Sequence, residues 1–443
     1  MFGWEFPPQI SGGLGVACEG LVRGLLQTGT EVVLVLPRHP AHKRTGRLRI
    51  VESLRDAQAL PEPSRGAAAP APRRTPTGEA VRRIETPLRP YPDLEPPESP
   101  RAVAVAPRTA EAPLRAAEDS NYGPNLASEV LLYAQRAGEI ALRERFDVIH
   151  SHDWMTLLAG MEARRISGRP LVAHVHATER DRSGAEGNAF VRDIERTGLN
   201  AADRVIAVSR YTARQVARDY GVPLERIRVV HNAVDPGDRI PRRRGRRQRP
   251  LVLFAGRITR QKGPGYFLEA AARVVREIPG VRFAVAGTGD LLPAMREGVE
   301  ALGLRRNLVF TGFLPPRDLD RLYASADVYV MPSLSEPFGL TALEALRHGT
   351  PAIVSRSAGV SEVVRNVLRV DFGDVDDLAS KILSVLLFAP LRRSLSSRGR
   401  REVLRLSWKE SAESCLAVYR ELLGIPARRR SGSRRGVESR LPA

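Results

Sequence analysis

Residues 328–355 have the sequence VYVMPSLSEPFGLTALEALRHGTPAIVS, and this stretch decides the fold. The β-rich run Val328–Met331 predicts a strand, and a second run, Ala352–Ser355, predicts another. Between them we expect a helix from about Leu340 to His348, with Gly339 permitting the tight turn that leads into it. A strand, a helix and a strand at this spacing predict a βαβ unit of a parallel sheet.

The same alternation extends in both directions from this stretch. The expected strands are Glu31–Leu36, Asp147–His150, Pro170–His176, Arg204–Val208, Ile227–His231, Leu251–Ala255, Arg282–Ala286 and Leu308–Thr311. Seven arginines crowd Arg239–Arg249, which predicts a solvated linker between two α/β domains. Ligands of such sheets bind at the carboxyl ends of the strands, so we expect the site in a cleft between the domains.

The expected organisation therefore has five parts. They are an N-terminal domain (1–236), a linker (237–250), a second domain (251–402), a terminal helical region (403–426) that includes Trp408–Leu422, and a basic tail (427–443). Within the first domain, helices are expected at Ala17–Leu26 and Asn125–Arg145. The proline-rich segment 41–118 has little apolar periodicity, so we expect it to be mostly disordered, with short strands such as Val81–Thr86.

Composition narrows the class of protein. The chain has 443 residues, and 69 basic against 50 acidic side chains give a net charge of +19, which usually indicates nucleic acid or an anionic membrane as a partner. A nucleic-acid-binding face needs aromatic residues among its basic ones, and the arginine clusters contain none. We therefore expect no specific nucleic-acid partner. Two cysteines are too few for a disulfide framework, and no apolar run is long enough to span a membrane. We expect a cytoplasmic globular protein.

Four of the eight histidines lie in two short motifs, His150-Ser-His152-Asp153-Trp154 and His174-Val-His176. Each motif begins in or follows an expected strand, where residues i and i+2 share a face. A zinc site is one interpretation, but no Cys or Glu has suitable ligand spacing. We therefore favour polar residues lining a cleft and expect no metal.

Two motifs suit a phosphate group. Ser11-Gly-Gly-Leu-Gly15 leads into a helix, where backbone amides and the helix N-terminus attract an anion. Gly256-Arg257 follows an expected strand, and Lys262 comes five residues later. A compact ammonium beside a guanidinium suits a diphosphate leaving group, although two solvated surface cations remain the alternative.

Two other motifs carry less information. Gly287-Thr-Gly289 follows a strand, but it lacks the third glycine of a dinucleotide-binding fingerprint. The acidic residues Asp374, Asp376 and Asp377 precede the helical pattern Leu378–Phe388, so a helix cap is a better interpretation of them than a metal site.

Together these motifs resemble the family-4 glycosyltransferases of the two-Rossmann-domain (GT-B) type, near the glycogen and starch synthase branch. Eight motifs occur in the family's order, and Glu336 with Glu344 matches its E-x7-E signature. The eight are Ser11–Gly15, His150–Trp154, His174–Glu179, Val230–Asn232, Gly256-Arg257 with Lys262-Gly263, Gly287–Asp290, Thr311–Phe313 and Glu336–Glu344. The resemblance implies two Rossmann-like domains with parallel sheets facing a central cleft, and a terminal helix from Trp408 that crosses back to the first domain.

The resemblance also implies an activity, the transfer of a hexosyl group from a nucleotide diphosphate sugar to an acceptor hydroxyl. The transfer is expected to retain the anomeric configuration and to need no metal. The transferred group is expected to be glucosyl and the acceptor to be a glucan. No cofactor is expected. The implied catalytic residues are His176, Arg257, Lys262 and Glu336; the donor-binding residues are Gly13, Leu14, Gly256, Gly287, Gly312, Phe313, Phe338, Gly339, Leu340 and Glu344; Asp153 and Trp154 lie on the acceptor side. In these roles Arg257 and Lys262 hold the pyrophosphate, Glu336 binds sugar hydroxyls, and Glu344 binds the ribose.

Two departures from the family pattern leave questions open. Glycogen synthases usually carry Lys-x-Gly-Gly-Leu-Gly, whereas Gln9 and Ile10 precede Ser11 here, so the donor could be an ADP, UDP or GDP sugar. Met1 lies where homologues have strand residues, so we expect a truncated first strand. Either the natural start lies upstream of Met1, which is the first expectation, or the fold is weakened. The alternatives are a lipid acceptor, with the arginine-rich tail touching an anionic membrane surface, a sugar-nucleotide epimerase, and a basic nucleic-acid-binding protein.

Overall fold

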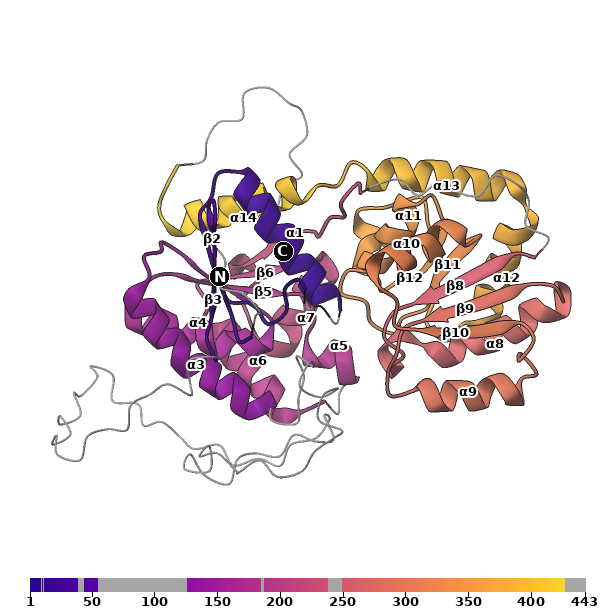
Figure 1. Cartoon of the computed structure of the whole chain (residues 1–443), viewed down its shortest axis with the longest axis horizontal. Helices are drawn as coiled ribbons and strands as arrows, with labels where there is room; N and C mark the ends of the chain where they lie inside the picture. The colour runs from indigo at the N-terminus through magenta and orange to yellow at the C-terminus, as the bar shows by residue number, and fades with distance from the viewer. Residues whose placement is uncertain are drawn as a thin grey trace.

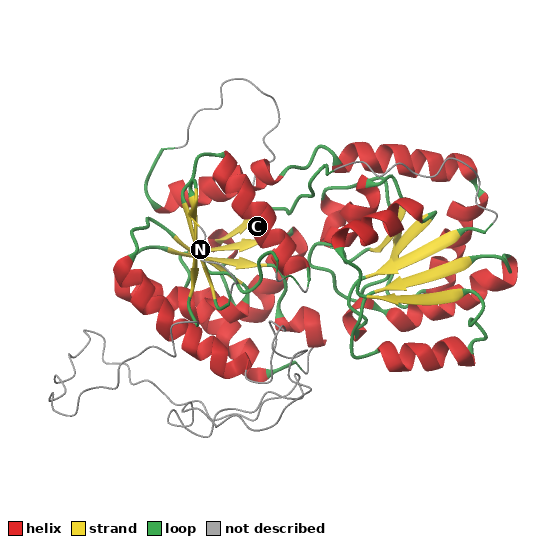
Figure 2. Cartoon of the chain, in the orientation of Figure 1, coloured by secondary structure: helices red, strands yellow, loops and turns green. Residues whose placement is uncertain are grey.

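The computed structural model describes residues 1–8, 10, 12–38, 44–54, 126–184, 187–237 and 249–426. Two α/β domains lie side by side, and each has a sheet with helices on its faces (Figure 1, Figure 2). The expected strand at Val81–Thr86, most of the arginine-rich linker and the basic tail lie outside the described residues. Within the described ranges, no helix is both long enough and apolar enough to cross a membrane.

The sheet of the first domain is built in two parts. One part has the order β1 (Val32–Leu36), β3 (Leu48–Glu52), β2 (Arg44–Thr45), and the other has the order β4 (Ile149–His152), β5 (Leu171–Val175), β6 (Arg204–Ala207), β7 (Ile227–Val229). All neighbouring strands are parallel except β2 and β3. Phe2 forms parallel bridges to Val35 of β1 and to Ser151 of β4, so the first residues of the chain join the two parts.

Helices cover this sheet. They are α1 (Gly13–Gln27), α3 (Leu126–Arg143), α4 (Trp154–Ser167), α5 (Glu179–Ser183), α6 (Ala189–Ala201), α7 (Arg210–Tyr220) and the short η3 (Leu224–Arg226). The terminal helix α14 (Trp408–Leu422) packs on α1 in this domain (Figure 1). The fit is close, because a Cβ atom on Gly20 would lie 2.1 Å from the Trp408 ring. Residues from both ends of the chain therefore share one core.

The second domain has a six-stranded parallel sheet in the order β10-β9-β8-β11-β12-β13. Its strands are β8 (Leu251–Ala255), β9 (Arg282–Ala286), β10 (Leu308–Gly312), β11 (Val328–Met331), β12 (Ala352–Ser355) and β13 (Leu368–Val370). Its helices are η4 (Arg260–Lys262), α8 (Pro264–Glu277), α9 (Leu292–Ala301), α10 (Pro316–Ser325), α11 (Leu340–Arg347), η5 (Gly359–Glu362), α12 (Val375–Leu387) and α13 (Ala389–Val403). Strands β8, β11 and β12 are fully buried apolar runs, as expected for a sheet covered on both faces.

The α/β architecture with parallel sheets in two domains is confirmed, and four details differ or gain precision. The prediction of disorder from residue 41 onward is wrong for residues 44–54, which form β2 and β3 beside β1. Strand β13 was not predicted, and α1 begins at Gly13 rather than at Ala17. The cap interpretation of the acidic cluster is confirmed, because the Asp374 side chain accepts a hydrogen bond from the Asp377 amide.

Candidate active site

Three of the predicted donor-side glycines meet where β8, β9 and β10 end. The Gly256 amide donates to the Ala286 carbonyl at 2.9 Å, and the Gly287 amide donates to the Gly312 carbonyl at 2.8 Å. Gly287 has φ = +134°, and a Cβ atom there would lie 1.9 Å from the Gly256 oxygen. Only glycine fits this close backbone approach between the loops that follow β8 and β9.

The structure pairs two of the predicted catalytic residues. Lys262 Nζ lies 2.5 Å from Glu336 Oε2, and the Ser333 hydroxyl donates to the same oxygen at 3.1 Å. Their side chains are only 19 % and 9 % exposed. A small open pocket lies next to Lys262, and its lining includes Gly256, Lys262, Ser333, Tyr329 and Thr341. The sheet edge thus carries a fixed ion pair next to a pocket.

Arg257, the other predicted cation, is exposed. Its side chain forms no ion pair and no hydrogen bond with the part of the chain that the structure describes. Phe313 is also exposed, at 64 %, whereas Phe338 is buried at 3 %. The structure therefore does not join Arg257 to the Lys262–Glu336 pair.

The loop from Glu336 to Gly339 is held on the backbone side by η5. The Gly359 amide donates to the Glu336 carbonyl at 3.0 Å, and the Val360 amide donates to the Phe338 carbonyl at 2.6 Å. Gly339 then takes φ = +104° as the N-cap of α11. A glycine cap has no side chain to bind the free amides of the first turn, which leaves these donors to a ligand.

Glu344 lies one turn into α11 and is partly buried. Burial raises the pKa of its carboxyl to about 7, and the Tyr323 hydroxyl donates to Oε2 at 3.1 Å. Such a carboxyl is poised to accept or donate a hydrogen bond near neutral pH.

The two domains touch where their glycine-capped helices begin. A Cβ atom on Gly13, the first residue of α1, would lie 3.7 Å from Leu340 Cδ1, at the start of α11. Gly12, the N-cap of α1, has no side chain, so this helix also presents amides without a side-chain cap. The neighbouring Leu14 packs against the core of the first domain. The structure therefore brings Gly13 and Leu340, two of the predicted donor-binding residues, close together.

The four histidines form a buried cluster at the ends of β4 and β5. His152 Nδ1 lies 2.8 Å from His176 Nε2, and His150 Nε2 lies 3.1 Å from His174 Nδ1. The rings of His174 and His176 stack with centroids 4.4 Å apart. Burial lowers the pKa of each of these imidazoles, so they are neutral at physiological pH.

Cys18 of α1 joins this cluster, which spacing along the sequence could not reveal. Its sulfur and ring nitrogens of His152 and His176 lie within 4.8 Å of one another. His152 Nδ1 and His176 Nε2 are each other's hydrogen-bond partners, however, so one of these two nitrogens carries the shared proton and only the other offers a lone pair. The geometry is that of a hydrogen-bonded imidazole pair.

Asp153 lies between β4 and α4 and connects the two histidine motifs. Its Oδ1 accepts hydrogen bonds from the His176 amide at 2.7 Å and the Ala177 amide at 3.3 Å. Asp153 has φ = +56° and ψ = 176°, a conformation that non-glycine residues rarely adopt and that is associated with functional sites. Trp154, the next residue, is 1 % exposed and packs in the core of the first domain, so it anchors the start of α4 next to Asp153.

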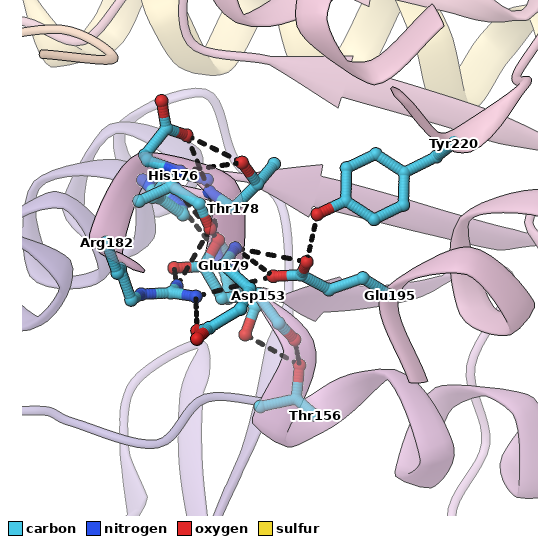
Figure 3. Close-up of polar contacts among 11 residues, drawn as sticks. Asp153, Thr156, His176, Thr178, Glu179, Arg182, Glu195 and Tyr220 are labelled. Carbon is cyan, nitrogen blue, oxygen red and sulfur yellow. Dashed lines mark hydrogen bonds and ion pairs between the residues drawn. The ribbon is translucent and has the colours of Figure 1, made fainter. Parts of the chain in front are cut away.

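Sequence reasoning missed the charged group that surrounds Asp153 (Figure 3). The Arg182 guanidinium lies 3.4 Å from Asp153 Oδ2 and 3.3 Å from Glu195 Oε1. Glu195 also accepts from the Glu179 amide at 2.8 Å and contacts the Tyr220 hydroxyl. Burial raises the pKa of Glu195 to about 7. In the sequence, the signal for these charged residues is the position of Glu195 among the apolar residues that form the buried face of α6.

Comparison with known proteins agrees with this geometry. Residues 11–238 match Glycosyltransferase Family 4, and residues 238–402 match Glycosyl transferases group 1. A D-inositol 3-phosphate glycosyltransferase from Acidothermus cellulolyticus is 33 % identical over 330 residues, which cover 68 % of this chain and 72 % of the relative. An uncharacterised glycosyltransferase from Methanocaldococcus jannaschii is 27 % identical over 446 residues, 96 % of this chain and 99 % of that one.

Solved structures share the fold. Sucrose-phosphate synthase from Thermosynechococcus elongatus superposes with a TM-score of 0.68 at 20 % identity, covering 94 % of each chain. Anabaena HepE in complex with UDP and glucose gives a TM-score of 0.58 at 22 % identity, covering 66 % of this chain and 82 % of that chain. With two parallel-sheet domains, the Glu336–Glu344 signature at their junction and a family match across more than half of its length, the chain belongs to the family-4 glycosyltransferases and is a nucleotide-sugar glycosyltransferase of the GT-B type.

Proposed function

We propose that this enzyme transfers a hexosyl group, with glucosyl first among the candidates, from a nucleotide diphosphate sugar to a carbohydrate hydroxyl with retention of configuration. The observation that carries the proposal is the Lys262–Glu336 pair, 2.5 Å apart beside a pocket at the carboxyl edge of the second sheet. A cation at this edge suits the charge that develops on a departing diphosphate, and the neighbouring carboxylate suits hydrogen bonds from sugar hydroxyls.

The chain's own cations are proposed to stabilise the leaving diphosphate. Negative charge develops on the departing phosphate in the transition state, and a preorganised cation in a partly buried site stabilises it without reorganisation. Lys262 is held by Glu336, whereas exposed Arg257 is free to close onto the phosphate as a planar fork. The glycine-capped starts of α1 and α11 add backbone donors. These groups act in place of a metal ion in the proposed mechanism.

In this proposal Glu336 and Glu344 bind different parts of the donor. Glu336, fixed by Lys262 and Ser333, accepts hydrogen bonds from hydroxyls of the transferred sugar. Glu344, held by Tyr323 on α11, binds the ribose. The carboxyl of Glu344 is half protonated near pH 7, so it can accept a hydrogen bond from one ribose hydroxyl or donate one.

The acceptor is proposed to enter from the first domain, past Asp153 and His176. The neutral imidazole of His176 suits a hydrogen bond to the reacting sugar, because it adds no positive charge beside a sugar ring that itself becomes positive. A glucan is the acceptor that the resemblance suggests. The names of two relatives, a D-inositol 3-phosphate glycosyltransferase and a sucrose-phosphate synthase, add small phosphorylated polyols and sugars as acceptors to test.

The test begins with donor binding. Thermal-shift measurements against UDP, ADP and GDP sugars identify the donor, because a ligand that binds only the folded state raises its apparent stability. Release of the nucleoside diphosphate is then measured with glucan, with phosphorylated acceptors and without acceptor. Transfer that requires an acceptor and survives EDTA supports the proposal. Donor conversion without any acceptor would instead support an epimerase.

Retention is tested on the product. NMR of the first-formed glycoside gives the anomeric proton coupling, which must match that of the donor. An inverted coupling would overturn the retaining mechanism and leave the donor assignment intact.

A further inference from the structure

The short helix α5 (Glu179–Ser183) occupies an unusual place between the domains. It follows His176 directly in the chain, and it contacts η4 (Arg260–Lys262) of the second domain. Its start is fixed by a capping box, in which the Thr178 hydroxyl accepts from the Asp181 amide while Asp181 Oδ2 accepts from the Thr178 amide.

One side of α5 holds the acceptor-side carboxylate. Arg182 lies 3.4 Å from Asp153 Oδ2 and donates to the Ala177 carbonyl at 2.8 Å. The guanidinium is kept in place by Glu195 at 3.3 Å, and Glu195 also binds the backbone where α5 begins (Figure 3). With Oδ1 taken by the His176 and Ala177 amides, both oxygens of Asp153 are held by this segment and its anchor.

The other side of α5 reaches the donor loop. The hydroxyl of Ser335, the residue before Glu336, hydrogen bonds to Asp181 Oδ1 and lies 2.9 Å from the Tyr211 hydroxyl. The Ser335 carbonyl accepts from the Gln261 side chain at 3.0 Å. Asp181 is 3 % exposed and Ser335 is 7 % exposed, so water does not weaken their contact. Gln261 precedes Lys262, so this contact lies next to both members of the Lys262–Glu336 pair.

We propose that Asp181 and Arg182 are positioning residues: adjacent side chains of one turn hold the donor-side Ser335–Glu336 loop and the acceptor-side Asp153 in a fixed relation. The inference rests on the proposed function for the roles of Glu336 and Asp153. It goes beyond that function, because neither Asp181 nor Arg182 has a proposed contact with donor or acceptor. Their effect is on how the two substrates are aligned across the domain junction.

The first experiment is a double-mutant cycle on Asp181→Ala and Ser335→Ala, read in kcat/KM for transfer. Loss of the capping box is common to Asp181→Ala and the double variant, so it cancels in the cycle. The expected coupling is about fivefold or more, since buried charge-assisted hydrogen bonds couple strongly. Additive losses in kcat/KM would overturn the proposal, as would a coupling seen only in unfolding free energy. If Asp181→Ala does not fold, Ser335→Ala is compared with Tyr211→Phe, which keeps the Asp181 bond and is expected to stay near wild type.

The second experiment uses Arg182→Met and Arg182→Lys, with Arg180→Met as the matched control. Arg180 lies on the same turn and pairs with Asp219 instead. We expect Arg182→Met to lower kcat or raise the acceptor KM roughly tenfold, with donor KM unchanged, and Arg182→Lys to recover part of the loss. Equal effects of Arg180→Met and Arg182→Met, or a matched change in donor KM, would refute the positioning role.

The two proposals can fail separately. Stabilisation of the Asp181 and Ser335 variants by ADP, UDP or GDP requires neither acceptor nor transfer, so it is measurable even if the proposed reaction does not occur. Non-additive loss of that stabilisation supports the link between α5 and the donor loop, and additive loss overturns it. Coupled variants without any transfer activity would refute the proposed function alone.

Discussion

Replacing Lys262 with Met separates the stabilising role of the Lys262–Glu336 pair from its proposed catalytic role. The variant leaves a carboxylate that is 9 % exposed, with the Ser333 hydroxyl as its other hydrogen-bond partner among the described side chains. Breaking a fully buried ion pair on one side costs about 3–5 kcal/mol. Lys262 is 19 % exposed, so solvent recovers part of this cost, and we expect a loss of about 2 kcal/mol in the free energy of unfolding.

The double variant Lys262→Met/Glu336→Gln removes both charges and keeps the volume. Its free energy of unfolding should return to within about 1 kcal/mol of wild type, because no unpaired charge is left buried. Its kcat should not return. Lys262→Met should lose more than about tenfold in kcat, equivalent to about 1.4 kcal/mol of transition-state stabilisation. The double variant should lose at least as much, because it also lacks the Glu336 carboxylate.

The assay is urea unfolding followed by circular dichroism, together with kcat at saturating donor. Lys381→Met is the matched control, since Lys381 pairs one turn away on α12 with Asp377, whose side chain is 32 % exposed rather than 9 %. Solvent can reach the carboxylate left behind, so this variant should cost less than about 0.5 kcal/mol. Full recovery of kcat in the double variant would refute the catalytic role of Lys262. If Lys262→Met is as stable as Lys381→Met, then water compensates the Glu336 carboxylate and the Lys262–Glu336 pair is solvated.

Three further predictions test other parts of the molecule. Glu344→Gln should change how the free energy of unfolding depends on pH. The pKa of Glu344 is about 7 in the folded state and 4.5 in the unfolded state, so folding disfavours the charged carboxylate. Wild type should therefore lose about 3 kcal/mol of stability relative to the variant as pH rises from 4.5 through 7. A stability difference that does not change with pH in parallel unfolding titrations would contradict this. Gly20→Ala should cost about 2 kcal/mol, because the new methyl group would lie 2.1 Å from the Trp408 ring, whereas Gly265→Ala in α8 has open space and should be neutral or stabilising in thermal melts. Asp153→Gly should be more stable than Asp153→Ala by about 1–3 kcal/mol in urea unfolding. Both variants lose the carboxylate, and only glycine accepts φ = +56° without strain. Equal urea midpoints for the two variants would show that the backbone at this position is not strained.

Much of the fold was predictable because the chain repeats a simple pattern. Strands such as Val328–Met331 and Ala352–Ser355 are short apolar runs between helices, and burial on both faces of a parallel sheet makes them stand out. Strand β3 did not stand out, because Leu48–Glu52 carries only one fully buried residue and borders a proline-rich segment. Its structure depends on pairing with β1, which the local sequence does not encode.

The site divides in the same way. Gly256, Gly287 and Glu336 could be located because they follow expected strands, and parallel strands end at one edge of the sheet. Cys18 beside His152, and Asp181 beside Ser335, are contacts between distant parts of the chain that spacing does not predict. Arg182 and Glu195 were missed for a different reason: charged residues on helices are usually solvated, and only their mutual pairing makes their burial favourable.

The packing of α14 on α1 has a consequence for synthesis of the chain. Trp408 and Cys415 share a core with Leu21 and Val172, so the first domain to leave the ribosome lacks one of its covering helices until the last domain has been made. At about 5–20 residues per second, that interval lasts tens of seconds. During it, the apolar face of α1 around Gly20 and Gly24 lacks its native partner, while the second domain, whose main core draws on residues 252–395, can fold. The nascent first domain is therefore the species on which chaperones are expected to act, and a chain cut before Trp408 should aggregate through α1.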